Sequence, residues 1–433
     1  MKAEILSVGT ELLLGQIVDT NANYLAQQLP ALGLDLYYVS SIGDNLQRLS
    51  AAFKQALDRS DVVISTGGVG PTEDDLTREA VAQVLGLPFD VSEEIVDRLR
   101  ARFARRGMTM PENNRRQAMV PRGAVMIDNV NGTAPGLWLE HGRAAIALLP
   151  GPPREMKPML EALIRDRIAP SRGAAGLFRR VLRLTGRAES DVDAHAGPIY
   201  RRWLDQSPPI ATTILAVLGQ IELHLAVTAQ NRAEADAALD AAVQELQAAF
   251  GPAVYSTDGR TLETVVGDLL RARKMTIAVA ESCTGGLLAS RLTDVPGSSD
   301  YLERGVVCYS NRAKVEMLGV PTDLIAAQGA VSEPVAQAMA AGIRARAETN
   351  VGVGITGIAG PGGGSEQKPV GTVAIAAIVD GEQRVRTFQF MGNREMVKFQ
   401  AAQSAMNMVR LMLLHADAGR EWSERSGEPA RNT

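Results

Sequence analysis

Residues 280–286 read Ala280-Glu281-Ser282-Cys283-Thr284-Gly285-Gly286. The apolar, largely β-branched segment 275–279 before them predicts a buried strand, and residues 287–292 after them have helical spacing. A strand-to-helix turn of this kind lifts a hydroxyl off the end of a sheet, and glycines let a substrate approach the backbone. Unpaired N–H groups at the helix start could hold a developing oxyanion. The turn suits a nucleophile, although Ser282 or Thr284 could instead serve only as a helix N-cap.

The residues that follow this turn favour a site. A strand predicted at 305–309 leads into Ser310-Asn311-Arg312-Ala313-Lys314, the expected first turn of a helix, so Tyr309 and Lys314 should lie near each other at one sheet edge. A buried strand at 351–355 precedes the glycine-rich loop 356–371, and loops of this length are uncommon unless they hold a ligand. Strands at 372–379 and 384–390 and a helix to about residue 415 complete this part.

The N-terminal part, from residue 3 to about residue 167, alternates short apolar strands with amphipathic helices. This alternation predicts a parallel sheet covered by helices on both faces. Ligands of such sheets bind beyond the carboxyl ends of the strands. The unusual residues occur at those ends, in the loops 9–15, 43–45 and 66–75.

The third of these loops joins a glycine-rich turn to an acidic cluster. Its backbone N–H groups could hold phosphate, whereas its carboxylates would repel phosphate unless a metal ion lay between. Together they predict a magnesium-assisted phosphate site, with Asp44, Asp74 and Asp75 as candidate ligands and the role of Glu11 left open. The alternative is a simple turn followed by acidic residues that stabilise a helix N-terminus.

Arginines are concentrated in the segment 98–106, where five occur on a predicted helix. A charge run of this kind is usually a solvated helix face, which is our expectation for Arg98, Arg100 and Arg102. Arg115 lies in a loop with proline and asparagines and is the better candidate for touching a phosphate. The turn at 149–156 closes this domain and begins a helix.

A module of about eighty residues separates the two parts, after a polar linker at 170–176. We expect strands at 179–185 and 220–228 and helices at 189–204 and 233–250, which is a small α+β fold. His195 and His224 have no evident acidic or cysteine partner in the sequence, so both are expected to be surface residues. The residues beyond Asp417 are polar and are expected to be disordered.

Length and composition narrow the function classes. A chain of 433 residues should hold two or three domains. A net charge of −4 and 4% aromatic residues argue against a nucleic-acid binder that uses a basic field and base stacking. Two cysteines cannot form a disulfide framework or a zinc cluster. With no signal peptide and no apolar run of membrane length, the sequence favours a cytoplasmic protein without a membrane partner.

Many ordered motifs resemble those of the CinA family, over nearly the whole chain up to about residue 416. The motifs that resemble its N-terminal, molybdopterin-binding-like domain are Gly9-Thr10-Glu11-Leu12-Leu13-Leu14-Gly15-Gln16, Thr66-Gly67-Gly68, Gly70-Pro71-Thr72 with Asp74-Asp75, and Met110-Pro111-Glu112-Asn113-Asn114-Arg115. The motifs that resemble its C-terminal deamidase domain are Glu281-Ser282-Cys283-Thr284-Gly285-Gly286, Tyr309-Ser310-Asn311, Gly329-Ala330-Val331-Ser332, Gly357-Ile358-Ala359-Gly360-Pro361 and Lys368-Pro369-Val370-Gly371. The turn Gly151-Pro152-Pro153 departs slightly from the family's usual Gly-Val-Pro.

The resemblance implies an α/β protein of two parallel-sheet, three-layer domains, at 1–170 and 259–416, joined by the α+β module at 177–255 and followed by a polar tail at 417–433. It implies that the C-terminal domain hydrolyses nicotinamide mononucleotide to nicotinate mononucleotide and ammonia. The N-terminal domain would be a metal-dependent pyrophosphatase that cuts ADP-ribose into AMP and ribose 5-phosphate. Both hydrolase activities would serve pyridine-nucleotide recycling in a homodimer, with no cofactor for the deamidase and a divalent metal, magnesium, for the other domain.

Residue roles follow from the same resemblance. Ser282 would be the nucleophile, with Lys314 as its base and Tyr309 beside it, which is a Ser-Lys arrangement of the kind known to replace a histidine triad. Lys314 must be neutral to act as a base, so we predict a desolvated amine with a lowered pKa. Substrate-binding candidates in this domain are Thr284, Gly285, Gly286, Asn311, Thr356, Gly357, Gly360, Gly363 and Lys368. In the N-terminal domain they are Thr10, Glu11, Gly67, Gly68, Gly70, Thr72 and Arg115.

Three alternatives stay open at this point. Cys283 could be the nucleophile, because a thiol is intrinsically more reactive than a hydroxyl. The chain could be a non-catalytic adaptor in competence or DNA repair, as the family's name suggests. The N-terminal domain could bind molybdopterin or transfer an adenylyl group to it, as its fold relatives do.

Overall fold

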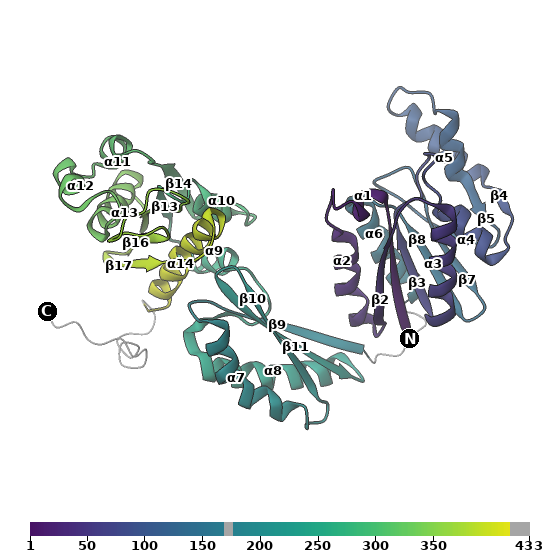
Figure 1. The fold of residues 1–433 in the computed structure, drawn as a ribbon, viewed down its shortest axis with the longest axis horizontal. Helices are drawn as coiled ribbons and strands as arrows, with labels where there is room; N and C mark the ends of the chain where they lie inside the picture. Colours follow the sequence, from purple (N-terminus) through teal and green to yellow (C-terminus); the bar gives the residue numbers. More distant parts are fainter. Residues whose placement is uncertain (169–175, 416–433) are drawn as a thin grey trace. The chain divides into compact units, whose positions relative to one another are not determined.

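The computed structural model describes residues 1–168 and 176–415. Three mixed or antiparallel sheets flanked by helices follow one another along the chain, together with a short two-stranded ribbon (Figure 1). This arrangement confirms the predicted α/β class. By spatial contact the described residues divide into two compact units, one formed by residues up to 179 with 227–237 and one formed by the remainder.

The first sheet has six strands in the order β2-β1-β3-β8-β7-β6. Strands β2, β1, β3 and β8 are parallel, as predicted, but β7 and β6 run antiparallel at one edge. A tight turn at Gly142, with φ of 59°, folds β7 back onto β8 and thereby reverses the strand direction. The strands are β1 Lys2–Val8, β2 Asp35–Ile42, β3 Val62–Thr66, β6 Val125–Ile127, β7 Gly136–His141 and β8 Ala144–Leu149, and the separate ribbon pairs β4 Phe89–Val91 with β5 Met119–Pro121.

Helices cover both faces of this sheet. Alternate strand residues point to opposite faces, so that Ile5 and Ile64 pack with α2 and α6, whereas Leu6 and Val63 pack with α3 and α4. Each face has its own buried apolar cluster, which explains the three layers. The helices are α1 Thr10–Leu13, α2 Thr20–Gln28, α3 Leu46–Arg59, α4 Thr77–Leu85, α5 Glu93–Ala104 and α6 Pro153–Leu163.

The middle module contains an antiparallel sheet in the order β10-β11-β9-β12 and two helices. Its strands are β9 Gly176–Leu184, β10 Ile210–Val217, β11 Gln220–Ala229 and β12 Val254–Ser256, and its helices are α7 Glu189–Trp203 and α8 Arg232–Phe250. The sequence had predicted β9, β11 and both helices but neither β10 nor β12. β12 is too short for an alternating pattern, and β10 exposes most of its residues.

The last sheet has five strands in the order β14-β13-β15-β16-β17. The first three are parallel, and a turn at Asp380 and Gly381 with positive φ at both residues makes the β16–β17 hairpin. Helices α9, α10 and α14 cover one face, and α11 to α13 cover the other. The strands are β13 Ile277–Glu281, β14 Leu302–Val307, β15 Val351–Gly357, β16 Thr372–Val379 and β17 Glu382–Gln389, and the helices are α9 Leu262–Arg273, α10 Leu287–Thr293, α11 Asn311–Leu318, α12 Thr322–Gln328, α13 Glu333–Ala347 and α14 Arg394–His415.

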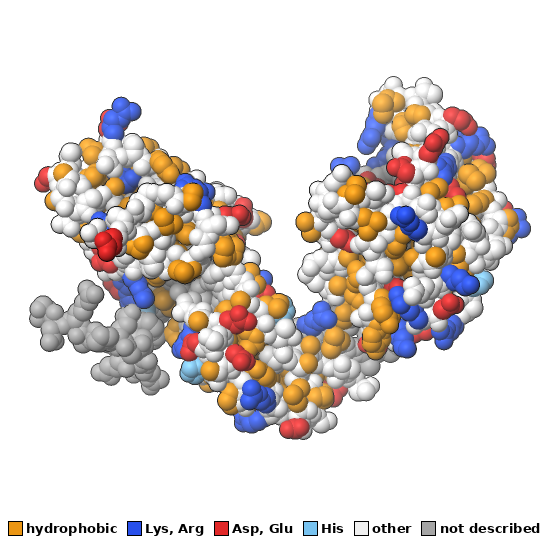
Figure 2. Space-filling view, in the orientation of Figure 1, with side chains coloured by type: hydrophobic (Ala, Val, Ile, Leu, Met, Phe, Trp, Pro, Cys, Tyr) orange, Lys and Arg blue, Asp and Glu red, His pale blue; other side chains and the backbone are white. Residues whose placement is uncertain are grey.

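None of the described helices combines the length and the apolar character that crossing a membrane requires. On the face of the molecule drawn in Figure 2, acidic and basic side chains are interspersed. The predicted linker at 170–176 lies outside the described residues except for Gly176, which begins β9, and the predicted tail lies wholly outside them.

Candidate active site

Ser282 lies at the carboxyl end of the central strand β13. Its N–H donates to the carbonyl of Ile355 over 3.0 Å, which continues the pairing of β13 with β15. The chain then turns through Gly285 and Gly286, whose φ angles of 64° and 95° favour glycine, before α10 begins. The predicted strand-to-helix turn is confirmed, and it leaves Ser282 7% exposed.

Glu281 organises this turn. Its buried carboxylate accepts hydrogen bonds from the backbone N–H groups of Gly286, Leu288 and Ala289, at 2.8–3.1 Å. These are N–H groups at the start of α10, so the expectation that they stay unpaired for an oxyanion is wrong. The N-cap of α10 is Gly286, which also removes the alternative that Ser282 or Thr284 serves as its cap.

Lys314 reaches Ser282 from the neighbouring helix α11. Its Nζ lies 3.0 Å from Ser282 Oγ, 2.9 Å from the carbonyl oxygen of Cys308 and 3.3 Å from that of Tyr309. The side chain is only 1% exposed, and burial lowers the pKa of Lys314 from its usual value. The predicted direction of this pKa shift is confirmed.

A cavity of about 260 Å³ opens in front of the two residues. Its walls come from the β13 turn, the start of α11, the loop at 330–331 and the glycine-rich loop after β15. Of the predicted residues, it is lined by Ser282, Tyr309, Lys314, Asn311, Thr356, Gly357, Gly360 and Gly363. The structure thus brings together in one pocket residues that are widely separated in the sequence.

Arg394, which the sequence analysis missed, completes the lining. It begins α14 and donates from Nη1 to the carbonyl of Gly360 over 2.8 Å and from Nη2 to the Tyr309 hydroxyl over 3.0 Å. Tyr309 is 60% exposed, so its ring lies at the rim of the pocket, whereas its carbonyl contacts Lys314. Apart from Lys314, no other lysine or arginine of the described residues lines this pocket, so the Arg394 guanidinium is its source of fixed positive charge.

Four predicted residues do not line the cavity. Gly285 and Gly286 form the turn, and Thr284 is completely buried with its hydroxyl unpaired. Lys368 donates to the carbonyls of Gln328 and Val331, at 2.9 and 2.7 Å, and so braces the loop that carries Ala330 and Val331. Their roles are therefore in shaping the walls.

Cys283 is the weaker candidate nucleophile. It lines the pocket but is almost fully buried, and burial raises the pKa of its thiol to about 12. A thiol must lose its proton to attack. At neutral pH the Cys283 side chain is a protonated, apolar part of the wall.

In the N-terminal domain the predicted loops are tied to one another by hydrogen bonds. Asp44 accepts from the N–H and the hydroxyl of Thr10, both at 2.8 Å, which joins the loops after β1 and β2. A Cβ on Gly67, at φ of 101°, would overlap the carbonyl oxygen of Val8, so this position requires glycine. Glu11 lies in the loop after β1, where its carboxylate lies against Gly9. Gly68 and Gly70 lie in the loop after β3, together with Gly67.

The side chain of Arg78 holds the loop after β3 in place. This arginine is buried and donates to the carbonyls of Val69 and Gly70. Asp75 accepts from the N–H and the hydroxyl of Thr72. The loop therefore has a defined shape before any ligand binds.

The arginine that contacts this loop is Arg116 and not Arg115, the candidate for touching a phosphate. Arg115 lies 3.5 Å from Glu93 in an exposed ion pair, whereas Arg116 donates to the carbonyl of Thr72 over 2.6 Å and pairs with Glu79. The two are adjacent in a 3₁₀ helix at Glu112–Ala118, which points them in different directions. Sequence alone could not choose between them.

The acidic residues fit only one kind of metal site. No group of three or more His, Cys, Asp or Glu side chains within the described ranges is placed to hold an ion. Magnesium is commonly bound through one or two carboxylates together with substrate phosphates, and Asp44 and Asp75 each keep one carboxylate oxygen that accepts no hydrogen bond from a described residue. The residues are thus compatible with an ion shared with a ligand rather than with a cage made by the protein.

Two further expectations are corrected. Both histidines have an acidic partner after all: His195 Nδ1 lies 3.2 Å from Asp191, one turn earlier in α7, and His224 Nε2 lies 2.9 Å from Glu222, two residues earlier on the same face of β11. Arg98 and Arg100 are exposed, as expected, beside Asp128 and Asp97. Arg102 is instead partly buried, and it lines a second cavity, between α5 and the loop 128–135, together with Arg98.

Three family models match consecutive parts of this chain, up to residue 413. Residues 4–170 match the family model described as "Probable molybdopterin binding domain", residues 179–256 match "Damage-inducible protein CinA KH domain", and residues 259–413 match "CinA C-terminal domain". A "Putative competence-damage inducible protein" from Moorella thermoacetica is 47% identical over 94% of this chain and 98% of its own length.

Other relatives agree. A "CinA-like protein" from Koribacter versatilis is 45% identical over 96% of this chain and its full length. The solved structure titled as the protein CinA with unknown function from Thermoplasma acidophilum is 32% identical, with a TM-score of 0.36, and covers 38% of this chain and 98% of its own. With relatives of such identity along almost its entire length, the chain belongs to the CinA family.

Proposed function

We propose that the C-terminal domain is an amidase that hydrolyses nicotinamide mononucleotide to nicotinate mononucleotide and ammonia. The observation that carries this proposal is the buried pair of Ser282 and Lys314, 3.0 Å apart, at the bottom of a pocket that also presents Arg394. A serine with an amine base suits acyl transfer, and a guanidinium suits a phosphate.

The hydrogen-bond partners of Lys314 explain how it could act as a base. A neutral amine has two N–H donors and one lone pair. The carbonyls of Cys308 and Tyr309 can accept the two N–H groups, which turns the lone pair towards Ser282 Oγ. Because burial lowers the pKa of Lys314, a larger fraction of this side chain is neutral than of an exposed lysine at the same pH.

The reaction then has two stages. Ser282 Oγ attacks the carboxamide carbon while Lys314 takes its proton, and Lys314 returns a proton to the amide nitrogen as the C–N bond breaks and ammonia leaves. Water, deprotonated by Lys314, attacks the resulting ester and releases the nicotinate product with regeneration of the Ser282 hydroxyl.

Two groups of the pocket can stabilise negative charge: one the oxyanion of the reaction intermediate, the other the substrate phosphate. No acceptor is found for the backbone N–H of Cys283 among the described residues, so this N–H is available to the oxyanion next to Ser282. Arg394 donates one N–H to the Gly360 carbonyl and one to the Tyr309 hydroxyl, and its remaining N–H groups can donate to the substrate phosphate. The glycines of the loop at 357–363 allow the ribose to approach the backbone.

Product analysis tests the proposal. Ser282→Ala should reduce formation of nicotinate mononucleotide by on the order of 10⁴-fold or more. Ser290→Ala, which removes an exposed serine hydroxyl from α10, is the matched control and should keep the parent rate. If the parent protein forms no product, or if Ser282→Ala turns over like the control, the amidase proposal fails.

For the N-terminal domain we propose hydrolysis of ADP-ribose to AMP and ribose 5-phosphate. The observation that supports it is the braced loop after β3, where Gly67 requires its left-handed conformation and Asp75 shapes the turn. A magnesium ion bound by Asp44, Asp74 or Asp75 and by the substrate would supply charge neutralisation at the pyrophosphate. The chain's own residues would hold and orient the phosphates.

A single pair of variants tests this second activity. Asp75→Asn keeps an oxygen for the hydrogen bonds from Thr72 but removes the negative charge, and it should greatly reduce AMP formation from ADP-ribose with magnesium. Glu73→Gln changes an exposed neighbour and should have little effect. Binding of molybdopterin without any AMP formation by the parent would favour the molybdopterin alternative instead.

A further inference from the structure

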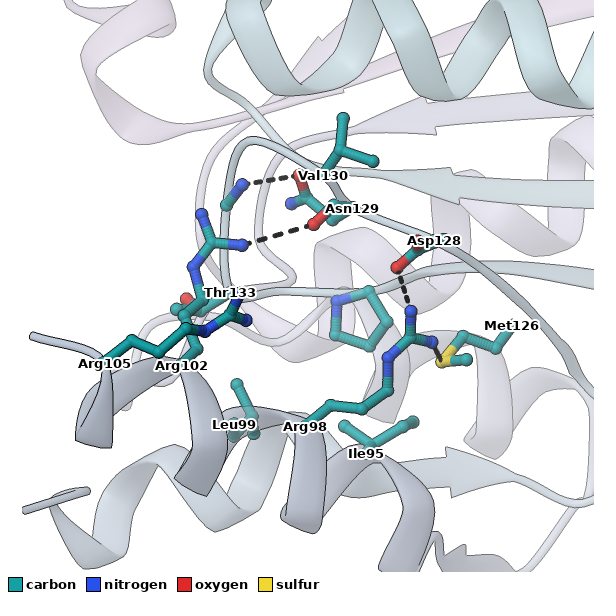
Figure 3. Close-up of a pocket in the computed structure, with 12 residues that line it drawn as sticks. Ile95, Arg98, Leu99, Arg102, Arg105, Met126, Asp128, Asn129, Val130 and Thr133 are labelled. Atoms are coloured by element: carbon teal, nitrogen blue, oxygen red, sulfur yellow. Dashed lines mark hydrogen bonds and ion pairs between the residues drawn. The ribbon is translucent and has the colours of Figure 1, made fainter.

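The N-terminal domain has a cavity of about 280 Å³ that lies apart from all three loops of the proposed pyrophosphatase site. It is enclosed by helix α5 and the loop 128–135 (Figure 3). None of the residues of loops 9–15, 43–45 or 66–75 lines it. Any ligand here would therefore be additional to the substrate of that site.

Three arginines face this cavity because of their helical spacing. Arg98, Arg102 and Arg105 are separated by four and three residues, so they lie on the same side of α5 and its C-cap. In Figure 3 their side chains extend from the helix toward the loop that carries Asp128 and Asn129. Arg100 lies two residues from both Arg98 and Arg102 and so on another side of the helix. It is exposed beside Asp97 and does not line the cavity.

The positive charge of the cavity is only partly neutralised. Arg98 pairs with Asp128 at 2.6 Å, and one nitrogen of Arg102 donates to the carbonyl of Asn129 over 3.4 Å. No ion pair joins Arg102 or Arg105 to a carboxylate in the ranges 1–168 and 176–415. Two guanidinium groups thus keep N–H donors from which a doubly charged phosphate group could accept hydrogen bonds.

The opposite wall is held in place by Asn129. This buried residue donates to the Ala134 carbonyl and to the Glu155 carboxylate, both at 2.8 Å, and accepts from the N–H groups of Asn131 and Gly132. A Cβ on Gly132 would overlap the Glu155 carboxylate, so the loop packs closely on α6. The wall is pre-formed, as small-molecule sites commonly are.

The floor of the cavity is apolar. Ile95 and Leu99 from α5 meet Met126 and Pro135. Guanidinium groups beside an apolar floor match a ligand that carries a phosphate on a flat or apolar body, and the volume suits a compound no larger than about a mononucleotide.

We propose that this cavity is a second ligand site of the N-terminal domain, which binds a phosphate monoester of a nucleoside-sized group. Arg102 and Arg105 hold the phosphate, and the body lies over Leu99 and Pro135. The proposal concerns binding alone and needs neither proposed hydrolysis to be correct.

The thioether of Met126 provides a local reporter, because its sulfur lies 3.7 Å from Arg98 Nη1 in the cavity. Full-length protein labelled with ¹³C in the methionine methyl groups would be titrated with AMP and, in parallel, with uncharged adenosine. Loss of one signal in Met126→Leu assigns the Met126 resonance, and the buried core residue Met156 reports that the fold is intact. AMP should shift the Met126 resonance saturably, and adenosine should not.

Paired variants show which residues are responsible. Arg102→Gln with Arg105→Gln should weaken the AMP response by at least about tenfold. Arg100→Gln with Arg106→Gln removes the same charge from α5 and the residues just after it, outside the cavity, and should leave the AMP response unchanged. An unmoved Met126 resonance at millimolar AMP, or an equal loss in both double variants, overturns the proposal. Equal affinity for inorganic phosphate would overturn the role given to the apolar floor.

Discussion

Lys314 is a buried amine whose charge state should set the pH dependence of the proposed amidase. Burial lowers its pKa in the folded protein, so the neutral amine binds a proton less readily there than in the unfolded chain. As pH rises through this lowered pKa, Lys314 becomes neutral and can accept the Ser282 proton. We expect kcat/KM for nicotinamide mononucleotide to rise with pH along a limb that ends on a plateau.

The same titration affects stability in a definite direction. Between the lowered pKa and the ordinary value for lysine, the unfolded state binds more protons than the folded state, so the free energy of unfolding should increase with pH. Ammonia release measured from about pH 5 to about pH 10 follows the first effect, and chemical denaturation follows the second. Lys314→Met should lose activity and also the rise in stability between the lowered pKa and the ordinary lysine value, and a rise that persists there in this variant would be due to another group.

Cys283 offers a second prediction at the same scale. Because burial raises the pKa of its thiol to about 12, Cys283→Ala should keep the proposed amidase activity within about tenfold of the parent, and iodoacetamide should inactivate slowly. The measurement is the rate of ammonia release before and after alkylation. Rapid inactivation that Cys283→Ala prevents would point to the thiol instead of Ser282.

At the scale of an element, the turn from β13 to α10 depends on Glu281. Its carboxylate receives three backbone N–H groups, and such charge-assisted bonds cost about 1–3 kcal/mol when a buried partner is lost. Glu281→Gln retains one oxygen acceptor and should lower both the free energy of unfolding and kcat, with little change in KM, because Ser282 is displaced while Arg394 stays. Glu303→Gln, at an exposed residue of β14, is the control and should alter neither quantity. A change in KM alone would argue against this positioning role.

The loop after β3 gives a parallel prediction for the N-terminal domain. Gly67→Ala would place a Cβ against the Val8 carbonyl at a φ that L-residues rarely adopt, which should cost on the order of 1–3 kcal/mol and disturb ADP-ribose hydrolysis. Gly123→Ala, at φ of 88° and so close to the φ of Gly67, has open space around the new methyl group. Thermal unfolding should show the larger loss for Gly67→Ala, and equal losses would mean that φ alone, and not the contact with Val8, matters there.

At the scale of the whole molecule, the two proposed activities draw on side chains from different sheets. Ser282 follows β13 of the last sheet, whereas Asp75 follows β3 of the first. We therefore expect Ser282→Ala to abolish amide hydrolysis and leave ADP-ribose hydrolysis intact, and Asp75→Asn to do the reverse. Both products would be assayed for both variants. If the two sites are coupled, each substitution should also reduce the activity of the domain that it does not alter.

The elements were more predictable than the contacts between them. The strand-to-helix turn at Ser282 and the helix that carries Lys314 followed from local apolar patterns and glycine positions, because these patterns depend on neighbouring residues. The antiparallel edges of both large sheets did not, since a tight turn such as that at Gly142 reverses a strand without changing its pattern. The spacing of apolar residues along a strand or a helix reports only local structure, so it does not show which distant segments pair with each other.

The site was predictable only in part for the same reason. Arg394 opens a long, mainly buried helix and has no local signal of function; its contacts with Gly360 and Tyr309 exist only in the fold. Lys368 shows the converse, because a lysine in a glycine-rich loop suggests a phosphate ligand, yet backbone carbonyls of another loop take its donors. Arg115 and Arg116 differ by a single position, and the turn geometry alone separates their partners.

The position of Arg394 has a consequence for how the protein is made. Ser282 and Lys314 belong to segments that are synthesised well before it, and Arg394 follows Lys314 by eighty residues. Domains generally fold as units, and α14 contributes many side chains to the core of this one, so the domain can fold fully only after α14 has been made. The nucleophile and its base are therefore synthesised long before the arginine, and the pocket gains its full set of lining side chains only after translation has passed the start of α14.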